Sequence, residues 1–341
     1  MTSRKGYRRA SLRCCVGALG AFWVAISGAA EPPVASAAST LAPRSLLTAV
    51  AASPRGLLMA VGERGHVLVS RDGGERWTQS LVPVDVLLTG VCFTDDNTAY
   101  VVGHDETILA TSDAGAHWRL ARYAPETRQP LLDVACLPDG SVIAVGAYAT
   151  IARSSDRGAT FQVSELQAAP IASAHKAARM DDDAELEQPH LNAIARADDG
   201  NVYIVGEGGH LYRSSDAGSH WQSLPSPYEG SWFSVLPLRG SSVLVAGLRG
   251  HLYRSDDRGQ HWQAVPTGVD TMLDGAVRLA DGRVVVVGLA GVVLTSSDDG
   301  YHFDVTRMAD RKGIAALIET SHGTVVVGES GVHSLTLPVR R

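Results

Sequence analysis

Residues 205–221 read VGEGGHLYRSSDAGSHW, and this pattern recurs along the chain. Its second half is the Asp-box motif Ser/Thr-x-Asp-x-Gly-x-x-Trp/Phe. A glycine that ends an apolar run stands eight residues before each box; a seventh such run, 325–328, has no box. The six boxes are Ser70-Asp72-Gly74-Trp77, Thr111-Asp113-Gly115-Trp118, Ser154-Asp156-Gly158-Phe161, Ser214-Asp216-Gly218-Trp221, Ser255-Asp257-Gly259-Trp262 and Ser296-Asp298-Gly300-Phe303.

The spacing of the boxes predicts the fold. Successive box aspartates are 41, 43, 60, 41 and 41 residues apart. A period of about 40–45 residues fits one four-stranded blade of a β-propeller. The single long gap indicates an insertion at 164–189. The sequence therefore predicts an all-β protein, with one seven-bladed propeller over residues 31–341.

Each repeat divides into four short strands separated by turn residues. Val, Ile, Leu and Tyr fill the apolar runs, and Gly with Asp or Asn marks the hairpins. The last repeat ends after three strands. We expect residues 34–41 to supply its outer strand and close the ring, which removes an open sheet edge.

The boxes themselves are expected to be structural rather than catalytic. The aspartate can accept hydrogen bonds from the backbone of its own hairpin loop, and the glycine relieves backbone strain. The aromatic residue can fold back over apolar surface. We assign this role to Asp72, Asp113, Asp156, Asp216, Asp257 and Asp298.

The N-terminus has the features of a secretory signal. Arg4, Lys5, Arg8, Arg9 and Arg13 precede an apolar stretch at 14–26, and small residues follow. Arg8-Arg9 resembles a twin-arginine export signal, although Ser11 replaces the usual aromatic residue. We expect a signal peptide at 1–30, with cleavage as late as residue 38, and an exported protein that is periplasmic or secreted. An uncleaved anchor is the alternative.

The net charge of the chain limits the classes of partner that it can bind. Without residues 1–30 the chain keeps 25 basic and 36 acidic residues. This excess of acid argues against nucleic acid as a partner, because phosphate binding needs basic patches.

The two cysteines outside the predicted signal peptide lie in neighbouring repeats. When these repeats are aligned with an offset of 43 residues, Cys92 falls opposite Ala135 and Cys136 falls opposite Phe93. The two thiols then point to opposite strand faces, so we expect no disulfide between them.

Candidate binding residues gather on one face of the predicted ring. The boxes occupy the other face, which we call the box face. The turns between second and third strands, and the connections between blades, lie on what we call the non-box face, where loops are free to vary. The candidates are Glu63, His104, Asp105, Tyr148, Glu207, His210, Tyr228, Glu229, Trp232, Arg249 and His251.

Within this set, the 227–233 loop carries aromatics beside an acid, which suits peptide or carbohydrate contact. The alternative is that Trp232 and Phe233 are ordinary first-strand core. His66, His210 and His251 occupy equivalent places, but blade one lies across the ring, so we expect no metal site. The acidic run 181–183 is expected to be a solvated loop, and no cofactor is expected.

Arg153, Arg213 and Arg254 stand at equivalent positions just before three box serines. They form a candidate basic stripe for an acidic partner segment. Hydrogen bonding between blades is the alternative that we favour.

The repeat resembles the photosystem II assembly/stability factor family, which comprises exported seven-bladed propellers. The resemblance covers the chain from about Leu46 and rests on 61–65 with Ser70 to Trp77, and on 205–209 with Ser214 to Trp221. The 227–233 loop looks more like relatives in non-photosynthetic bacteria. The resemblance implies a non-catalytic scaffold that binds a membrane protein or its exposed segment.

Glycosidases of the sialidase type also carry Asp-boxes, so a carbohydrate-active enzyme is the alternative. Such an enzyme needs an arginine triad and a carboxylate pair. The Arg-Ile-Pro run expected before the first box is replaced by Pro43-Arg44-Ser45. Glu207 with Asp105 or Glu229 is the carboxylate pair that this alternative would use.

Overall fold

The computed structural model describes residues 32–169 and 188–337. The predicted signal peptide and the acidic run 181–183 lie outside these residues. The described residues from Pro33 onward belong to one compact unit. Among the described residues, the helices are three-residue 3-10 turns, and none of them could span a bilayer.

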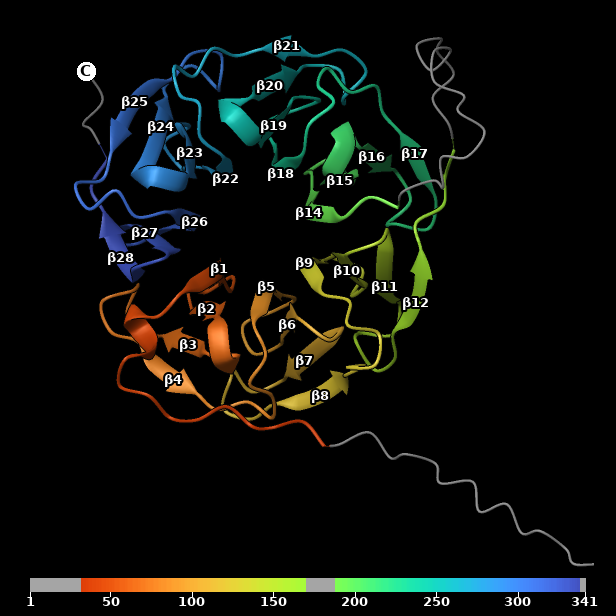
Figure 1. Cartoon of the computed structure of the whole chain (residues 1–341), viewed down its shortest axis with the longest axis vertical. Coiled ribbons are helices and arrows are strands. Elements are labelled where there is room, and N and C mark those ends of the chain that lie inside the picture. Colours follow the sequence, from red (N-terminus) through yellow and green to blue (C-terminus); the bar gives the residue numbers. More distant parts are fainter. Residues whose placement is uncertain (1–31, 170–187, 338–341) are drawn as a thin grey trace, which may run out of the picture. The chain divides into compact units, whose positions relative to one another are not determined.

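Seven sheets stand in a ring around a central axis, which confirms the seven-bladed β-propeller (Figure 1). In each blade the first strand lies nearest the axis, and the chain moves outward strand by strand. Blades one to four comprise β1 (Leu47–Ala52), β2 (Leu58–Gly62), β3 (Val67–Ser70), β4 (Thr78–Ser80); β5 (Leu88–Phe93), β6 (Ala99–Gly103), β7 (Thr107–Thr111), β8 (Arg119–Arg122); β9 (Leu131–Cys136), β10 (Val142–Gly146), β11 (Thr150–Ser154), β12 (Gln162–Glu165); and β14 (Leu191–Arg196), β15 (Val202–Gly206), β16 (Leu211–Ser214), β17 (Trp221–Ser223).

The remaining three blades follow the same order, and the last has three strands within the described residues. They comprise β18 (Trp232–Pro237), β19 (Val243–Gly247), β20 (Leu252–Ser255), β21 (Gln263–Ala264); β22 (Leu273–Arg278), β23 (Val284–Gly288), β24 (Val292–Ser296), β25 (Asp304–Arg307); and β26 (Ile314–Thr320), β27 (Gly323–Gly328), β28 (Gly331–Leu335).

The hydrophobic core lies between neighbouring blades. The second strand of nearly every blade is buried along its whole length, because each of its faces packs on a different blade. One cluster, for example, joins Tyr100 and Val102 of blade two to Leu131 and Val142 of blade three. This explains why the apolar runs in the sequence are continuous rather than alternating.

The predicted strand closure of the last blade is wrong. Residues 34–41 form no strand and run beside blade one instead. The backbone N–H of Ser36 donates to Val82 O at 2.9 Å, and Ser39 donates to the Gln79 side chain at 2.7 Å. The ring closes because β1 packs against β26, and because the short 3-10 helix η1 (Ala42–Arg44) packs against β28.

The predicted insertion contributes to the fold at its beginning. Residues Ala168–Ala169 form β13, which pairs in parallel with β17. Blade four therefore has five strands. Residues 170–187 of the insertion lie outside the described residues.

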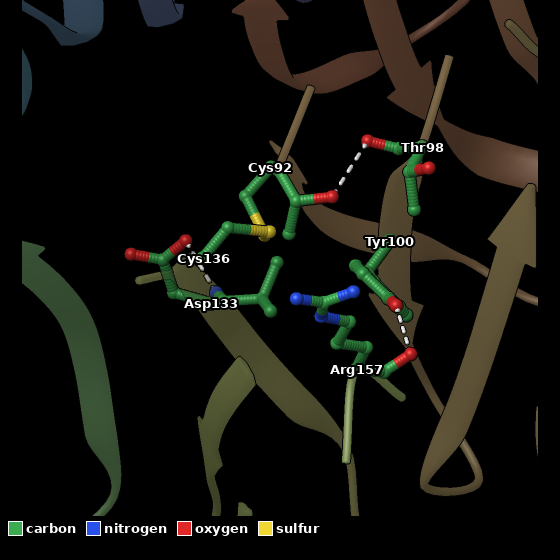
Figure 2. Close-up of a disulfide and its surroundings, with 8 residues drawn as sticks. Cys92, Thr98, Tyr100, Asp133, Cys136 and Arg157 are labelled. Carbon is green, nitrogen blue, oxygen red and sulfur yellow. Dashed lines mark hydrogen bonds between the residues drawn. A yellow bond between two sulfur atoms is a disulfide. The ribbon is translucent and has the colours of Figure 1, made fainter. Parts of the chain in front are cut away.

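Cys92 and Cys136 form a disulfide, so our expectation of two free thiols is wrong (Figure 2). The two side chains do point to opposite faces of equivalent strands, β5 and β9. These strands belong to neighbouring blades, however, and opposite faces of neighbouring blades meet in the space between them. The Cα atoms are 5.7 Å apart, within the usual range for a disulfide.

All six boxes share one hydrogen-bond pattern. The Ser or Thr hydroxyl donates to the aspartate and accepts the glycine N–H, while the aspartate accepts the N–H four residues ahead of it. At Asp113, the backbone N–H of His117, then its imidazole and the Thr111 hydroxyl, lower the pKa of the carboxyl to about 2. The box glycines have positive φ, from 71° to 96°. The boxes are therefore turns stabilised from within.

The pattern predicts the cost of breaking one box. Ser214→Ala removes the acceptor of the buried Gly218 N–H, which lies 2.9 Å from Ser214 Oγ. We expect the free energy of unfolding to fall by about 1–2 kcal/mol, as measured by urea denaturation. Ser215→Ala is the matched control, because this exposed serine of the same box makes no side-chain hydrogen bond within the described residues. Equal stability of the two variants would contradict the structural role.

Candidate functional site

The turns between second and third strands build the non-box face. Most are 3-10 turns: η2 (Glu63–Gly65), η3 (Glu207–Gly209), η4 (Leu248–Gly250) and η5 (Leu289–Gly291). In blades one to six the tip residue of this turn has φ between 54° and 59°, although only one of these tips is glycine. For a non-glycine residue, this left-handed backbone conformation is less stable than the right-handed one by about 1–2 kcal/mol. The tips are Arg64, Asp105, Tyr148, Gly208, Arg249 and Ala290.

One group of candidate residues forms where blades three and four meet. The Tyr148 side chain is 50% exposed, and its ring lies edge-on to His190, with centroids 5.1 Å apart. His190 Nδ1 lies 3.5 Å from Glu207 Oε1, and the His190 backbone N–H donates to Glu207 Oε2. His190 therefore links two residues that the sequence singled out.

A second group forms where blades four and five meet. The rings of Tyr228 and His251 stack with centroids 4.0 Å apart. Trp232 lies edge-on beneath Tyr228 and also contacts Tyr253. Trp232 is completely buried, so its prediction as an exposed contact residue is wrong, and the alternative of ordinary core describes it. Trp232 supports Tyr228 from below.

The turn η3 joins the two groups. The Gly209 N–H donates to Gly230 O at 2.9 Å, and a side chain at Gly209 would collide with the Tyr228 carbonyl oxygen. Next to this turn, His210 Nδ1 is hydrogen-bonded to the Tyr212 hydroxyl at 2.9 Å, and burial raises the pKa of Tyr212 to about 12. We call the resulting surface the aromatic patch; it comprises Tyr148, His190, Tyr228 and His251, with Glu207 and the exposed Glu229 beside them.

The other predicted residues on the non-box face are not part of this patch. Glu63 lies on blade one, where it accepts the Leu46 N–H. His104 and Asp105 form the turn of blade two. Arg249 is the exposed tip of blade five. The structure thus gathers Tyr148, Glu207, Tyr228 and His251 at the junctions of blades three to five, and the other candidates lie apart from them.

The candidate basic stripe consists of bridges between blades. Arg153 donates to Ala217 O, and Arg213 donates to Arg258 O. Arg254 is 4% exposed, donates to Asp299 O and is paired with Asp256 at 2.7 Å. Each guanidinium is therefore engaged with a box loop of the next blade, as in the alternative of hydrogen bonding between blades.

The first strands enclose a central cavity of about 450 Å³. Each of these strands has a β-bulge at its second residue, and all seven bulge residues line the cavity. Bulges re-aim side chains and often occur next to functional sites. The bulge residues are Thr48, Thr89, Leu132, Asn192, Phe233, Asp274 and Ala315.

Two acids in the cavity wall escaped the sequence analysis. Burial raises the pKa of Asp133 to about 6, although the N–H groups of Ile194 and Val134 donate to its carboxylate. Burial raises the pKa of Asp274 to about 7, and no hydrogen bond to this carboxyl occurs within the described residues. The signal for both was an acid inside an otherwise apolar first strand.

His190 also escaped the sequence analysis, because it follows the insertion and breaks no apolar pattern. Its signal was its place directly before a first strand, the position that Ser231 has in blade five. Within 32–169 and 188–337, no group of three or more His, Cys, Asp or Glu side chains could hold a metal ion.

No family model matches this chain. The protein YkuO of Bacillus subtilis (strain 168), described as uncharacterized, is 32% identical over 87 residues, which are 25% of this chain and 29% of that protein. The chain therefore matches less than a third of that relative's length.

Solved structures show the same fold at low identity. YCF48 bound to D1 peptide is 17% identical, with a TM-score of 0.63 over 88% of this chain and 96% of that one. YCF48 from Cyanidioschyzon merolae is 17% identical, with a TM-score of 0.65 over 85% and 94%. A streptogramin B lyase is 11% identical, with a TM-score of 0.68 over 85% and 93%. Since propellers of this shape include both a peptide-binding protein and an enzyme, fold alone does not assign function.

Proposed function

We propose that this protein is an exported, non-catalytic scaffold that binds a membrane protein, or its exposed segment, through the aromatic patch. The observation that carries the proposal is the pair of aromatic groups, Tyr148 with His190 and Tyr228 with His251, on either side of η3. Tyrosine and other aromatic side chains are enriched at protein interfaces, because they bury much area at little entropic cost. Rigid blades hold the patch in place, so binding orders few side chains.

The comparisons support a protein partner. The similar propeller YCF48 has been solved with a peptide, D1 peptide, bound to it. The residues of the aromatic patch come from turns and blade connections, the parts of a propeller that vary most freely. We therefore expect a segment of a partner protein to lie across blades three to five.

The disulfide supports the proposal of export. Structural disulfides form and persist in oxidising compartments and are rare in the cytosol. The basic and apolar segments at 4–26 fit the same route. Export of the chain and oxidation of Cys92 and Cys136 are thus expected together.

The glycosidase alternative has weaker support. It requires two carboxylates within reach of one glycosidic bond. Glu207 is held by His190, and Asp105 lies on blade two with blade three between them. Glu229 is a separate exposed residue of the connection to blade five.

Affinity capture from the membrane fraction tests the proposal. We expect Tyr148→Ala to weaken partner binding by about 1–2 kcal/mol, five- to thirtyfold, because Tyr148 is the most exposed ring of the patch. The control is Tyr301→Ala, a tyrosine of similar exposure beside a box, which should bind like the wild type. Turnover on a glycoside panel without any captured partner would overturn the scaffold.

A further inference from the structure

Four of the seven bulge residues in the central cavity have polar side chains, and three of these four make the same kind of hydrogen bond. Thr48 donates to Leu88 O at 2.6 Å, Thr89 donates to Leu131 O at 2.7 Å, and Asn192 donates to Trp232 O at 2.8 Å. In each case the polar bulge side chain bonds to the carbonyl that precedes the bulge in the next blade. These bonds tie neighbouring blades together at the cavity wall.

Asp274 occupies the same position in blade six but cannot make this hydrogen bond as a carboxylate. An ionised carboxylate has no proton to donate, and the structure gives its oxygens no hydrogen-bond donor within the described residues. Asp274 is partly exposed, and its exposed surface lines the cavity. Asp274 is therefore an acid at the cavity wall to which no described residue donates a hydrogen bond.

The surroundings of Asp274 define what would satisfy it. The adjacent bulge residues are Phe233 on β18 and Ala315 on β26, and neither is polar. Small residues, Gly275 and Ala316, also line this side of the cavity. An aromatic ring next to a carboxylate suits a cation, because the ring face and the acid both attract positive charge. Asp133, across the ring on β9, adds further negative charge.

We propose that the central cavity binds a cationic group, an alkylammonium or a guanidinium, with Asp274 as its counter-ion and Phe233 beside it. The cation belongs either to a free small amine or to a lysine or arginine side chain of a bound chain segment. This site shares no residue with the aromatic patch, so its test is independent of the test of the proposed scaffold function.

The first arm of the test uses n-pentylamine and measures binding by calorimetry at pH 8 with the full chain. We expect saturable binding, at least about tenfold weaker for Asp274→Asn, because the charged partner is lost. n-Pentanol, which has the same stem without charge, should not bind. Asp270→Asn removes an exposed acid four residues earlier and should bind pentylamine like the wild type.

A second variant keeps the result interpretable if Asp274→Asn folds poorly. Asp274→Thr introduces the residue type found at the equivalent positions Thr48 and Thr89. We expect this variant to fold, with the new hydroxyl donating to Ile314 O. It should have lost pentylamine binding. If Asp274→Asn or Asp274→Thr folds and still binds n-pentylamine like the wild type, the proposed cation site is wrong.

The second arm separates the two sources of the cation. It compares n-pentylamine with a capped alanine pentapeptide that has one central lysine, and with the same peptide carrying norleucine. Tighter binding of the lysine peptide than of both others assigns the site to a chain segment; tighter binding of n-pentylamine assigns it to a free amine. If neither n-pentylamine nor the lysine peptide binds saturably, Asp274 is not a cation site and the inference fails.

Discussion

Replacement of both Cys92 and Cys136 with alanine is expected to lower the free energy of unfolding by about 4 kcal/mol. The disulfide closes a loop of 44 residues between the innermost strands of blades two and three. A crosslink over such a loop restricts the unfolded chain, and chain-entropy arguments give about 4 kcal/mol for this length. Urea denaturation of the oxidised wild type and of the double variant measures the difference.

Reduction of the wild type provides the matched control for this variant. Dithiothreitol should bring the wild type close to the stability of the double variant, and it should leave the double variant unchanged. The core between these blades includes Tyr100 and Leu131 and persists without the crosslink, so the variant should still fold. Two titratable thiols in the natively exported protein would contradict the disulfide and the compartment that it supports.

The propeller was predictable because its blades repeat. The glycine and box spacings identified six blades, and the apolar run at 325–328 identified the seventh. The closure of the ring was not predictable in the same way, since residues 34–41 belong to no repeat. Their place beside blade one depends on single contacts, such as that of Ser36 with Val82, which no spacing reports.

The disulfide was missed for a geometric reason. Alignment of repeats compares positions within equivalent blades, whereas the disulfide depends on how two blades face each other. When blades two and three stand side by side, one face of β5 and the opposite face of β9 border the same space between the blades. In a ring of blades, opposite faces of equivalent strands therefore favour the crosslink between Cys92 and Cys136.

The candidate site was predictable as a face but not as a set of contacts. Turn and blade-connection positions predicted that Tyr148, Glu207, Tyr228 and His251 share the non-box face. The burial of Trp232 and the linking role of His190 depend on packing between blades, which the repeat does not encode. Asp274 was visible as an acid within a first strand, but its missing donor became apparent only beside Thr48 and Thr89.

Asp274→Asn is expected to stabilise the protein at pH 8 by about 2–4 kcal/mol relative to the wild type, and to have little effect at pH 4. Burial raises the pKa of Asp274 from 3.8 to about 7 in the folded protein. The folded state thus holds a proton that the unfolded chain releases above pH 4. Such a group contributes stability at low pH, and this contribution is lost as pH rises from 4 through 7; one pKa unit is worth about 1.4 kcal/mol.

Thermal denaturation between pH 4 and pH 8 measures this effect, with Asp270→Asn as the control of equal charge change. Asp133 is the other titratable group that lines the cavity; its pKa of about 6 leaves a smaller pH dependence in Asp274→Asn. A wild type whose free energy of unfolding does not change from pH 4 to pH 8 would contradict the raised pKa of Asp274.

A gain in stability on removal of Asp274 would also support a functional role for this residue, because residues that lower stability without a structural partner are typical of functional sites. The stability of Asp274→Asn and its loss of pentylamine binding are therefore two consequences of one unpartnered acid.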